Sequence, residues 1–286
     1  MDKRFEQGRD FLKSNWHYVT ETASDQSRGM PAPPQEFPPE EDDSVIPLPP
    51  VENAYSERVR GAATANGRNG TSGTSTVADV TEATAAQSAT PTPSSPELAG
   101  ALHYLLKNRK SRRLFTATPL PLEQLSFLLW SCEGVRENKG KFSFRTTPSG
   151  GARHPLDVYV FAHNVTSLKI GLYRYLPLEH SLVLEREGDD SATLDEALNG
   201  QFRNSSCVIM WAAVPYRSEW RYGKAADKLV ALDAGHSCQN LYLACEALKL
   251  GTCAIGAYDQ KKLDAYLGLD GEDMFAMYAA PVGTPR

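Results

Sequence analysis

Residues 61–97 contain no aromatic residue and no Leu, Ile or Met, and they consist mainly of Ala, Thr, Ser, Gly and Pro. Such a segment cannot bury enough apolar surface to offset the chain entropy that folding would remove. We therefore predict a flexible linker there. It would separate an N-terminal segment, residues 1–60, from a folded C-terminal domain, residues 98–286.

The N-terminal segment is too rich in proline to form a domain of its own, because eight prolines lie between Met30 and Pro50. Its apolar side chains are few and scattered, among them Phe5, Phe11 and Trp16. Proline-rich chains favour extended conformations without internal hydrogen bonds. We expect an N-terminal Pro-rich arm that lies over another surface.

The charge balance and the start of the chain exclude several classes of protein. A formal net charge of −5 gives no general surplus of positive charge for nucleic acid or an anionic membrane. The first ten residues lack the apolar stretch of a signal peptide, and no run of about eighteen apolar residues occurs. We expect a cytoplasmic, soluble protein that binds neither nucleic acid nor membrane.

The cysteines indicate core packing rather than disulfides or a metal site. Their number is odd, they form no CxxC pair, and their neighbours are apolar. We expect reduced, buried thiols and no metal ion. The five are Cys132, Cys207, Cys238, Cys245 and Cys253.

Helix and strand patterns are mixed along the C-terminal domain, which favours an α+β fold. The residues Ser94-Ser-Pro-Glu97 form the capping-box pattern that precedes a helix, and Pro121 opens a second one. Residues 207–214 are continuously apolar, as expected of a strand covered on both faces. The other predicted strands are 156–162, 171–175, 181–186, 252–257 and 275–282, with short helices at 194–198 and 260–267.

Residues 228–250 form a long predicted helix that ends at Gly251, where a left-handed cap meets least steric resistance. Its apolar side chains occupy more than one stripe. In a chain of this size, a helix that is apolar on several sides suggests a subunit interface.

Two segments have residue types that bind anions. In Arg109-Lys-Ser-Arg-Arg113, guanidinium forks could hold phosphate oxygens, although solvated basic residues at a helix C-terminus have the same pattern. In Pro148-Ser-Gly-Gly-Ala-Arg153, a ligand could approach the backbone N–H groups of adjacent glycines, or the segment is a plain turn. Neither matches a Rossmann or P-loop signature.

Two further segments combine polar and aromatic side chains. Within the long helix, Asp233-Ala-Gly-His-Ser-Cys-Gln-Asn240 includes His236, for which a structural hydrogen bond is favoured over catalysis. In Trp220-Arg-Tyr-Gly-Lys224, Arg221 could hold an anion and Tyr222 could donate a proton. Surface packing accounts for this last segment equally well.

These four segments, in this order, make residues 98–286 similar to the nitroreductase superfamily, specifically its SagB-type dehydrogenase or azoline (thiazoline-oxazoline) oxidase branch. The most specific stretches run from Arg145 to Val160, from Asp233 to Leu243 and from Leu248 to Ala257. The resemblance implies a nitroreductase-like, FMN-dependent fold with a central antiparallel sheet flanked by helices. It also implies an intertwined homodimer with two FMN molecules at the subunit interface.

The resemblance assigns one group of residues to the polar end of FMN. Arg109, Ser111 and Arg113 match the motif that grips the phosphate and the ribityl chain. Arg286 matches a late basic residue that meets the phosphate.

A second group matches the surroundings of the isoalloxazine ring. Ser149, Gly150 and Gly151 match the loop that lies along this ring. Ile255 and Gly256 match the place where backbone N–H groups reach flavin N5 and O4.

Arg221-Tyr222 departs from the azoline oxidases, which have a Lys-Tyr pair as base and proton carrier at this position. Arginine is not deprotonated at ordinary pH, so Arg221 cannot be that base.

The leading hypothesis is therefore an FMN-dependent oxidoreductase that transfers hydride between NAD(P)H, or a reduced substrate, and a small-molecule acceptor. Tyr222 and Arg221 are its catalytic candidates. A SagB-type azoline dehydrogenase acting on a modified peptide is the first alternative, and a non-catalytic flavin-binding or interaction module is the second.

Overall fold

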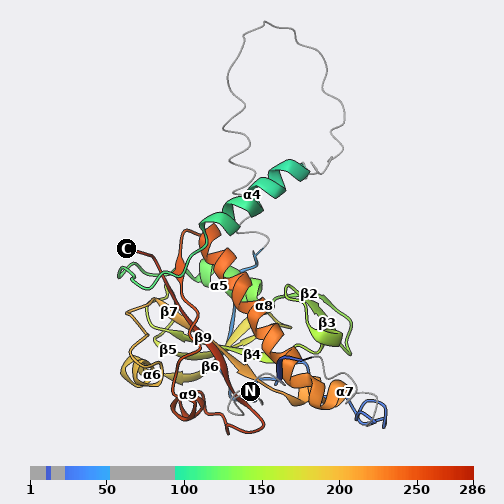
Figure 1. The fold of residues 1–286 in the computed structure, drawn as a ribbon. Coiled ribbons are helices and arrows are strands. Elements are labelled where there is room, and N and C mark those ends of the chain that lie inside the picture. The colour runs from blue at the N-terminus through green and yellow to red at the C-terminus, as the bar shows by residue number, and fades with distance from the viewer. Residues whose placement is uncertain (1–10, 14–22, 52–93) are drawn as a thin grey trace, which may run out of the picture.

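The structure is a computed structural model that describes residues 11–13, 23–51 and 94–286. Its centre is a seven-stranded sheet with the strand order β1-β6-β5-β4-β7-β9-β8, and every neighbouring pair is antiparallel (Figure 1). The predicted antiparallel sheet is confirmed. The strands are β1 (Val45–Pro47), β4 (Leu156–Ala162), β5 (Gly171–Leu176), β6 (Ser181–Glu187), β7 (Cys207–Ala213), β8 (Gly251–Thr252) and β9 (Phe275–Gly283).

Helices cover both faces of this sheet and form two cores. All residues of β7 are buried, because Trp211 points into one core and Met210 into the other. The Trp211 core lies under α5 and α8, and the Met210 core lies under α6 and α9. These helices are α5 (Leu122–Glu133), α6 (Ser191–Ala197), α8 (Ala226–Ala247) and α9 (Gln260–Leu267).

The described part of the N-terminal arm lies on the chain's own domain. Strand β1 extends the sheet, with Val45 paired opposite Val183 of β6. The Trp220 indole donates a hydrogen bond to the carbonyl of Met30 at 3.0 Å. Residues 61–93 of the predicted linker lie outside the described residues.

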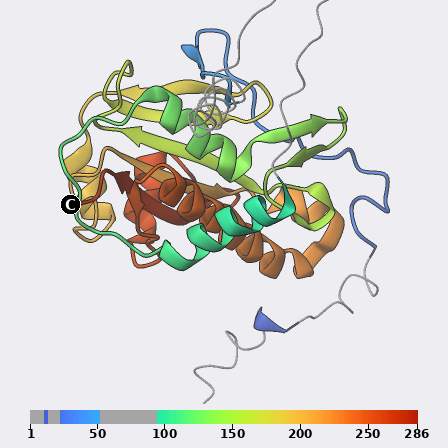
Figure 2. The ribbon, with the colours of Figure 1, turned by 90° about the horizontal axis from the view of Figure 1, so that it is seen from above.

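Helix α4 (Ser95–Asn108) begins as the capping box predicts. The Glu97 carboxylate accepts a hydrogen bond from the Ser94 N–H at 2.8 Å. None of the residues of α4 is buried, and Leu98, Leu102 and Leu106 are each more than half exposed. Figure 2 shows α4 beside α8, so an apolar face is open next to the long helix.

Helix α8 ends differently from our prediction. The left-handed residue after it is Lys249, with φ 58°, whereas Gly251 starts β8. A Cβ at Gly251 would lie 2.9 Å from the Cβ of Arg112. The prediction of a left-handed cap at Gly251 was therefore wrong, since glycine is needed there for the close approach of another segment.

Three short elements differ from the sequence-based expectation. The hairpin of β2 (Val135–Asn138) and β3 (Ser143–Arg145) lies in a region where no strand was predicted. Helix α7 (Tyr216–Tyr222) precedes α8, and the strand predicted at 252–257 is reduced to β8 and one bridge between Ile255 and Ala279.

All five cysteines are unpaired and buried, as predicted. Among the described helices, none is both long and apolar enough to cross a membrane. The described part of the chain also contains no cluster of three His, Cys, Asp or Glu side chains arranged for a metal ion.

Candidate functional site

The loop that contains Ser149 and Gly150 is fixed to one side of α8. Ser149 Oγ donates a hydrogen bond to Asp233 Oδ2 at 2.5 Å, and the backbone N–H of His154 donates to Ser149 Oγ at 2.9 Å. Burial raises the pKa of Asp233 to about 6, against the hydrogen bonds from Ser149 and from the Gly150 backbone, which favour the charged form. Asp233 therefore holds this loop in place.

Arg221 and Tyr222, the two catalytic candidates, lie against Gly151. This glycine has φ 60°, and a Cβ there would overlap the Tyr222 hydroxyl and lie 3.1 Å from Cδ of Arg221. A larger residue at Gly151 would be strained and would displace both side chains. The structure thus brings the predicted glycine loop and the predicted catalytic pair together.

Tyr242 holds a second group of residues on the other side of α8. Its hydroxyl lies 2.9 Å from Ser111 Oγ and accepts a hydrogen bond from the Ala254 N–H at 2.8 Å. The Arg109 guanidinium lies over the Tyr242 ring, 5.1 Å from its centroid. One tyrosine therefore connects the predicted phosphate motif with the segment that leads to Gly256.

The basic segment contains arginines with different tasks. Arg112 forms a salt bridge with Glu246 at 2.6 Å. Arg109, Arg113 and Arg286 have no salt-bridge partner among the described residues. Arg286 is instead held beside the segment by its Nε, which donates to the Phe115 carbonyl at 2.9 Å.

The two backbone positions expected to reach a flavin are not equivalent. The Ile255 N–H donates to the Ala279 carbonyl at 2.7 Å, so the sheet already uses this donor. Gly256 is exposed, and among the described residues the only heavy atom within 4 Å of a Cβ built there is Cε2 of Tyr278, at 3.9 Å. Of the two positions, Gly256 is therefore the one at which a flavin could make the expected contact with the backbone.

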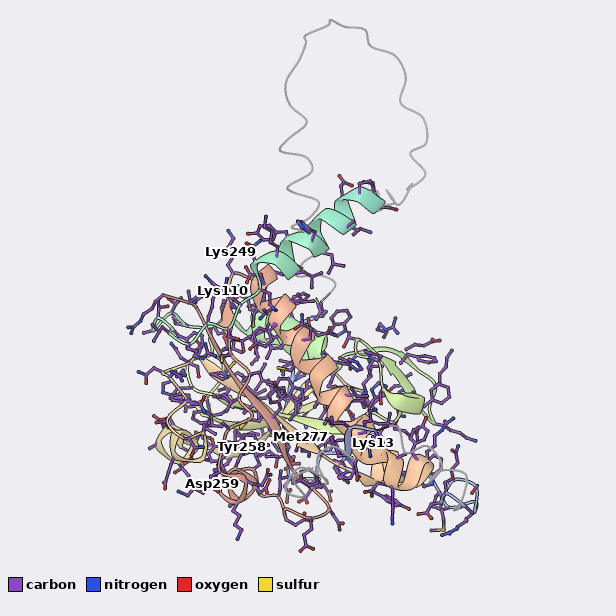
Figure 3. The ribbon with its side chains drawn as sticks, viewed as in Figure 1. Lys13, Lys110, Lys249, Tyr258, Asp259 and Met277 are labelled. Carbon is purple, nitrogen blue, oxygen red and sulfur yellow. The ribbon has the colours of Figure 1, made fainter. Side chains whose placement is uncertain are left out.

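The Asp233 group and the Tyr242 group face opposite sides of α8. Nine residues at about 100° each add up to two and a half turns. In Figures 1 and 3 the β2–β3 hairpin lies on one side of α8, and Tyr258 and Asp259 lie on the other. Within one copy of the chain, the two groups do not converge on one site.

A cleft of about 1640 Å³ runs along the Asp233 side of α8. Ser149, Gly151 and Arg221 line it, together with α5, the β2–β3 hairpin and residues 32–35 of the arm. A space of this size next to a glycine loop can accept a small-molecule ligand.

A buried network lies beneath this loop. Arg145 donates to Glu133 Oε2 at 3.3 Å, and Nε2 of His154 lies 3.1 Å from the Ser143 carbonyl oxygen. Burial raises the pKa of Glu133 to about 7 in spite of the Arg145 charge. Burial, assisted by the Arg145 charge, lowers the pKa of His154 to about 3.

These two shifts change stability with opposite signs. Unfolded His154 binds a proton below pH 6.5 and folded His154 does not, so its contribution to stability is lost as the pH falls from 6.5 toward 3. Folded Glu133 keeps a proton that the unfolded residue releases, so its contribution is lost as the pH rises from 4.5 toward 7. In the wild type the two slopes oppose each other between pH 4.5 and 6.5.

We expect Glu133→Gln to remove the pH dependence of stability that comes from Glu133 and to keep the one that comes from His154. The free energy of unfolding should then rise with pH more steeply than in the wild type. The slopes of the variant and the wild type should differ by at most about 1.4 kcal/mol per pH unit. His154→Gln should show the reverse slope. Urea unfolding at about pH 5 and pH 6 measures both, and equal slopes in all three proteins would contradict the assignment.

Asp233 and Tyr242 were not among the predicted site residues. Asp233 carried a signal, because it is a carboxylate at the start of a polar run in an otherwise apolar helix. Tyr242 carried none, since a tyrosine in such a helix matches ordinary core packing.

Comparison with known proteins gives a family match over most of the domain. Residues 106–284 match the nitroreductase family profile. A Methanocaldococcus jannaschii protein that carries a provisional nitroreductase name is 33% identical over 185 residues, which are 64% of this chain and 90% of the relative.

The structure of a provisionally named nitroreductase from Ralstonia eutropha JMP134 is 26% identical, with a TM-score of 0.57. The match covers 90% of this chain and 99% of that one. Because residues 98–286 make up about two thirds of the chain, it includes residues before position 98.

Two more distant structures show the fold alone. A provisionally named nitroreductase from Anabaena variabilis ATCC 29413 is 23% identical with a TM-score of 0.56 over 65% of this chain, which spans only 38% of that protein. The microcin synthetase McbBCD complex of E. coli, with truncated pro-MccB17 bound, is 15% identical with a TM-score of 0.53, over 82% of this chain and 92% of that one.

Proposed function

The chain belongs to the nitroreductase family, and on that basis we propose that it is an FMN-dependent oxidoreductase. It would transfer hydride between NAD(P)H, or another reduced small molecule, and a small-molecule acceptor. The observation that carries this proposal is that two surfaces able to bind a ligand lie on opposite sides of α8. One is the basic segment at Tyr242, in which Arg109 and Arg113 have no salt-bridge partner among the described residues, and the other is the glycine loop at the cleft.

The basic segment that contacts Tyr242 through Arg109 and Ser111 fits the phosphate end of FMN. Arg109 and Arg113 have charges without a salt-bridge partner in the described chain, and Ser111 adds a hydroxyl donor. The Arg109 guanidinium already lies on the Tyr242 ring, so little freedom is lost when it binds an oxyanion. When bound, FMN supplies the acceptance and release of electrons that no side chain here provides.

We propose a homodimer in which each flavin site is built from both copies. Since the 149–151 loop and the Tyr242 group face opposite sides of α8, the loop of one copy would face the FMN held by the other copy. The exposed leucines of α4 and the half-exposed Leu232 of α8 offer an apolar surface for this contact.

Tyr222 and Arg221 would then act on the substrate from beside the flavin. The Tyr222 hydroxyl, held against Gly151, can hold or deliver a proton, whereas the Arg221 guanidinium can orient an anionic group. Because hydride transfer from a nicotinamide depends on stacking and alignment, it needs no protein base.

The direct test is the absorption spectrum of the purified protein, followed by stopped-flow mixing with NADH and with NADPH. We expect a yellow dimer whose flavin absorbance is bleached by at least one of the two donors. A folded, colourless protein that takes up no added FMN would contradict the proposal and favour a non-catalytic interaction module.

Tyr222→Phe should leave the rate of bleaching by NAD(P)H within about tenfold of the wild-type rate, or about 1.4 kcal/mol of barrier. Tyr216→Phe is the matched control, because Tyr216 lies in the same helix and donates a hydrogen bond to Asp25. A loss of several orders of magnitude in Tyr222→Phe alone, with FMN still bound, would give this hydroxyl an essential proton-transfer role.

That last outcome would support the second candidate, a SagB-type azoline dehydrogenase acting on a modified peptide. The position of Tyr222 favours this candidate, because its hydroxyl lies against Gly151, which lines the 1640 Å³ cleft, and could take a proton from a substrate bound there. Its test is oxidation of a thiazoline-containing peptide by the purified protein, followed by mass spectrometry for a loss of two hydrogen atoms.

A further inference from the structure

The charged side chains that line the cleft all have the same sign. They are Arg136, Lys141, Arg145, Arg153 and Arg221, and no Asp or Glu of the described chain is among the lining residues. The whole chain has 35 acidic and 30 basic residues, so its composition does not explain this bias. A concave surface with one sign of charge concentrates ligands of the opposite sign.

Arg145 is paired with Glu133, whereas the other four cations have no salt-bridge partner in the part of the chain that the structure describes. Of these four, Arg153 and Arg221 lie against the same glycine, Gly151. Burial and the nearby charge of Arg221 both lower the pKa of Arg153. An oxyanion between the two guanidinium groups would relieve this repulsion.

The local geometry holds both guanidinium groups at one place. Arg153 Nε donates to the Gly151 carbonyl at 3.3 Å, and the Arg221 side chain packs against the same glycine. The Arg153 guanidinium lies over the Trp220 ring at 5.1 Å from its centroid. The Trp220 ring is itself fixed by its hydrogen bond to Met30 of the arm.

The rest of the cleft favours a flat, apolar ligand body. The lining includes the aromatic side chains of Phe127, Trp130, Phe142, Phe144 and Trp220. Aromatic rings of this kind bind planar molecules by stacking and edge contacts.

We propose that Arg153 and Arg221 together bind the oxyanion, a carboxylate or a phosphate, of a planar substrate whose body lies among the aromatic side chains of the cleft. The inference rests on the proposed function only in calling this ligand a substrate. The binding itself requires no flavin chemistry and is measured separately.

The experiment is isothermal titration of the purified protein with 4-nitrobenzoate and with its neutral analogue 4-nitrobenzamide. We expect the wild type to bind the anion at least about tenfold more tightly. Arg153→Gln and Arg221→Gln should each reduce that preference by about tenfold, and Arg221→Lys should retain part of it. A third probe, 4-nitrophenyl phosphate, distinguishes a phosphate site from a carboxylate site.

Lys141→Gln is the matched control, since Lys141 lines the same cleft on the hairpin turn and should leave the preference within about threefold. Equal binding of the two nitro compounds to the wild type, or an equal effect in the Lys141 variant, would overturn the proposal. So would arginine variants that weaken the dimer in sedimentation without changing the preference, because the arginines would then pair with another subunit. A colourless protein that still shows the preference would refute only the flavin proposal.

Discussion

Replacement of Arg109 by alanine is expected to weaken FMN retention by about 10- to 100-fold. The guanidinium is a charge-assisted donor worth about 1.5–3 kcal/mol to a phosphate. It is also pre-positioned by its stacking on Tyr242, 5.1 Å from the ring centroid. Dialysis of the yellow protein, followed by titration of the flavin-free protein with FMN, measures the loss directly.

Lys110→Ala is the control for Arg109→Ala, because it removes a neighbouring positive charge that is exposed at the end of α4. Figure 3 labels Lys110 near the junction of α4 and α8. Its effect on FMN affinity should stay within about threefold, since an isolated exposed charge contributes little. Equal losses in the two variants would mean that the basic run acts only as a diffuse positive charge at a helix end.

Most regular elements were predictable because their signals are local. The predicted strand 156–162 has the same bounds as β4, and the capping box before α4 forms as expected. The β2–β3 hairpin was missed because its strands are short and the buried positions of β3 are the polar residues Ser143 and Arg145, so no apolar alternation marks them. Strand β1 was missed because it pairs with β6, more than a hundred residues further along the chain.

The candidate site was predictable as a set of residues but not as a shape. The resemblance assigned roles to Ser111 and Ser149, yet both contact α8 through residues to which it gave no role. Ser149 bonds to Asp233, and Ser111 to Tyr242. That these partners lie on opposite sides of one helix follows from their nine-residue spacing only after the contacts are known.

The opposite orientation of these two groups predicts complementation between subunits. Arg109→Ala damages the Tyr242 group, and Gly151→Val damages the loop, because φ is 60° there and a Cβ would overlap Tyr222. Each variant alone should retain little bound FMN and little activity. In a mixed dimer, one site would combine the intact loop of the first chain with the intact Arg109 of the second. That dimer should therefore recover about half of the wild-type flavin content and activity.

The decisive comparison is a dimer of the wild-type chain with a chain that carries both Arg109→Ala and Gly151→Val. Both dimers contain the same two substitutions and differ only in how the chains share them, so general instability affects them equally. If each site uses both copies, every site in the second dimer has one defect, and its flavin content should be close to that of the single variants. If each site lies within one chain, the results are exchanged: the second dimer keeps one intact site and the first keeps none. Co-expression with two affinity tags isolates both dimers, and recovery in the second alone would refute the shared site.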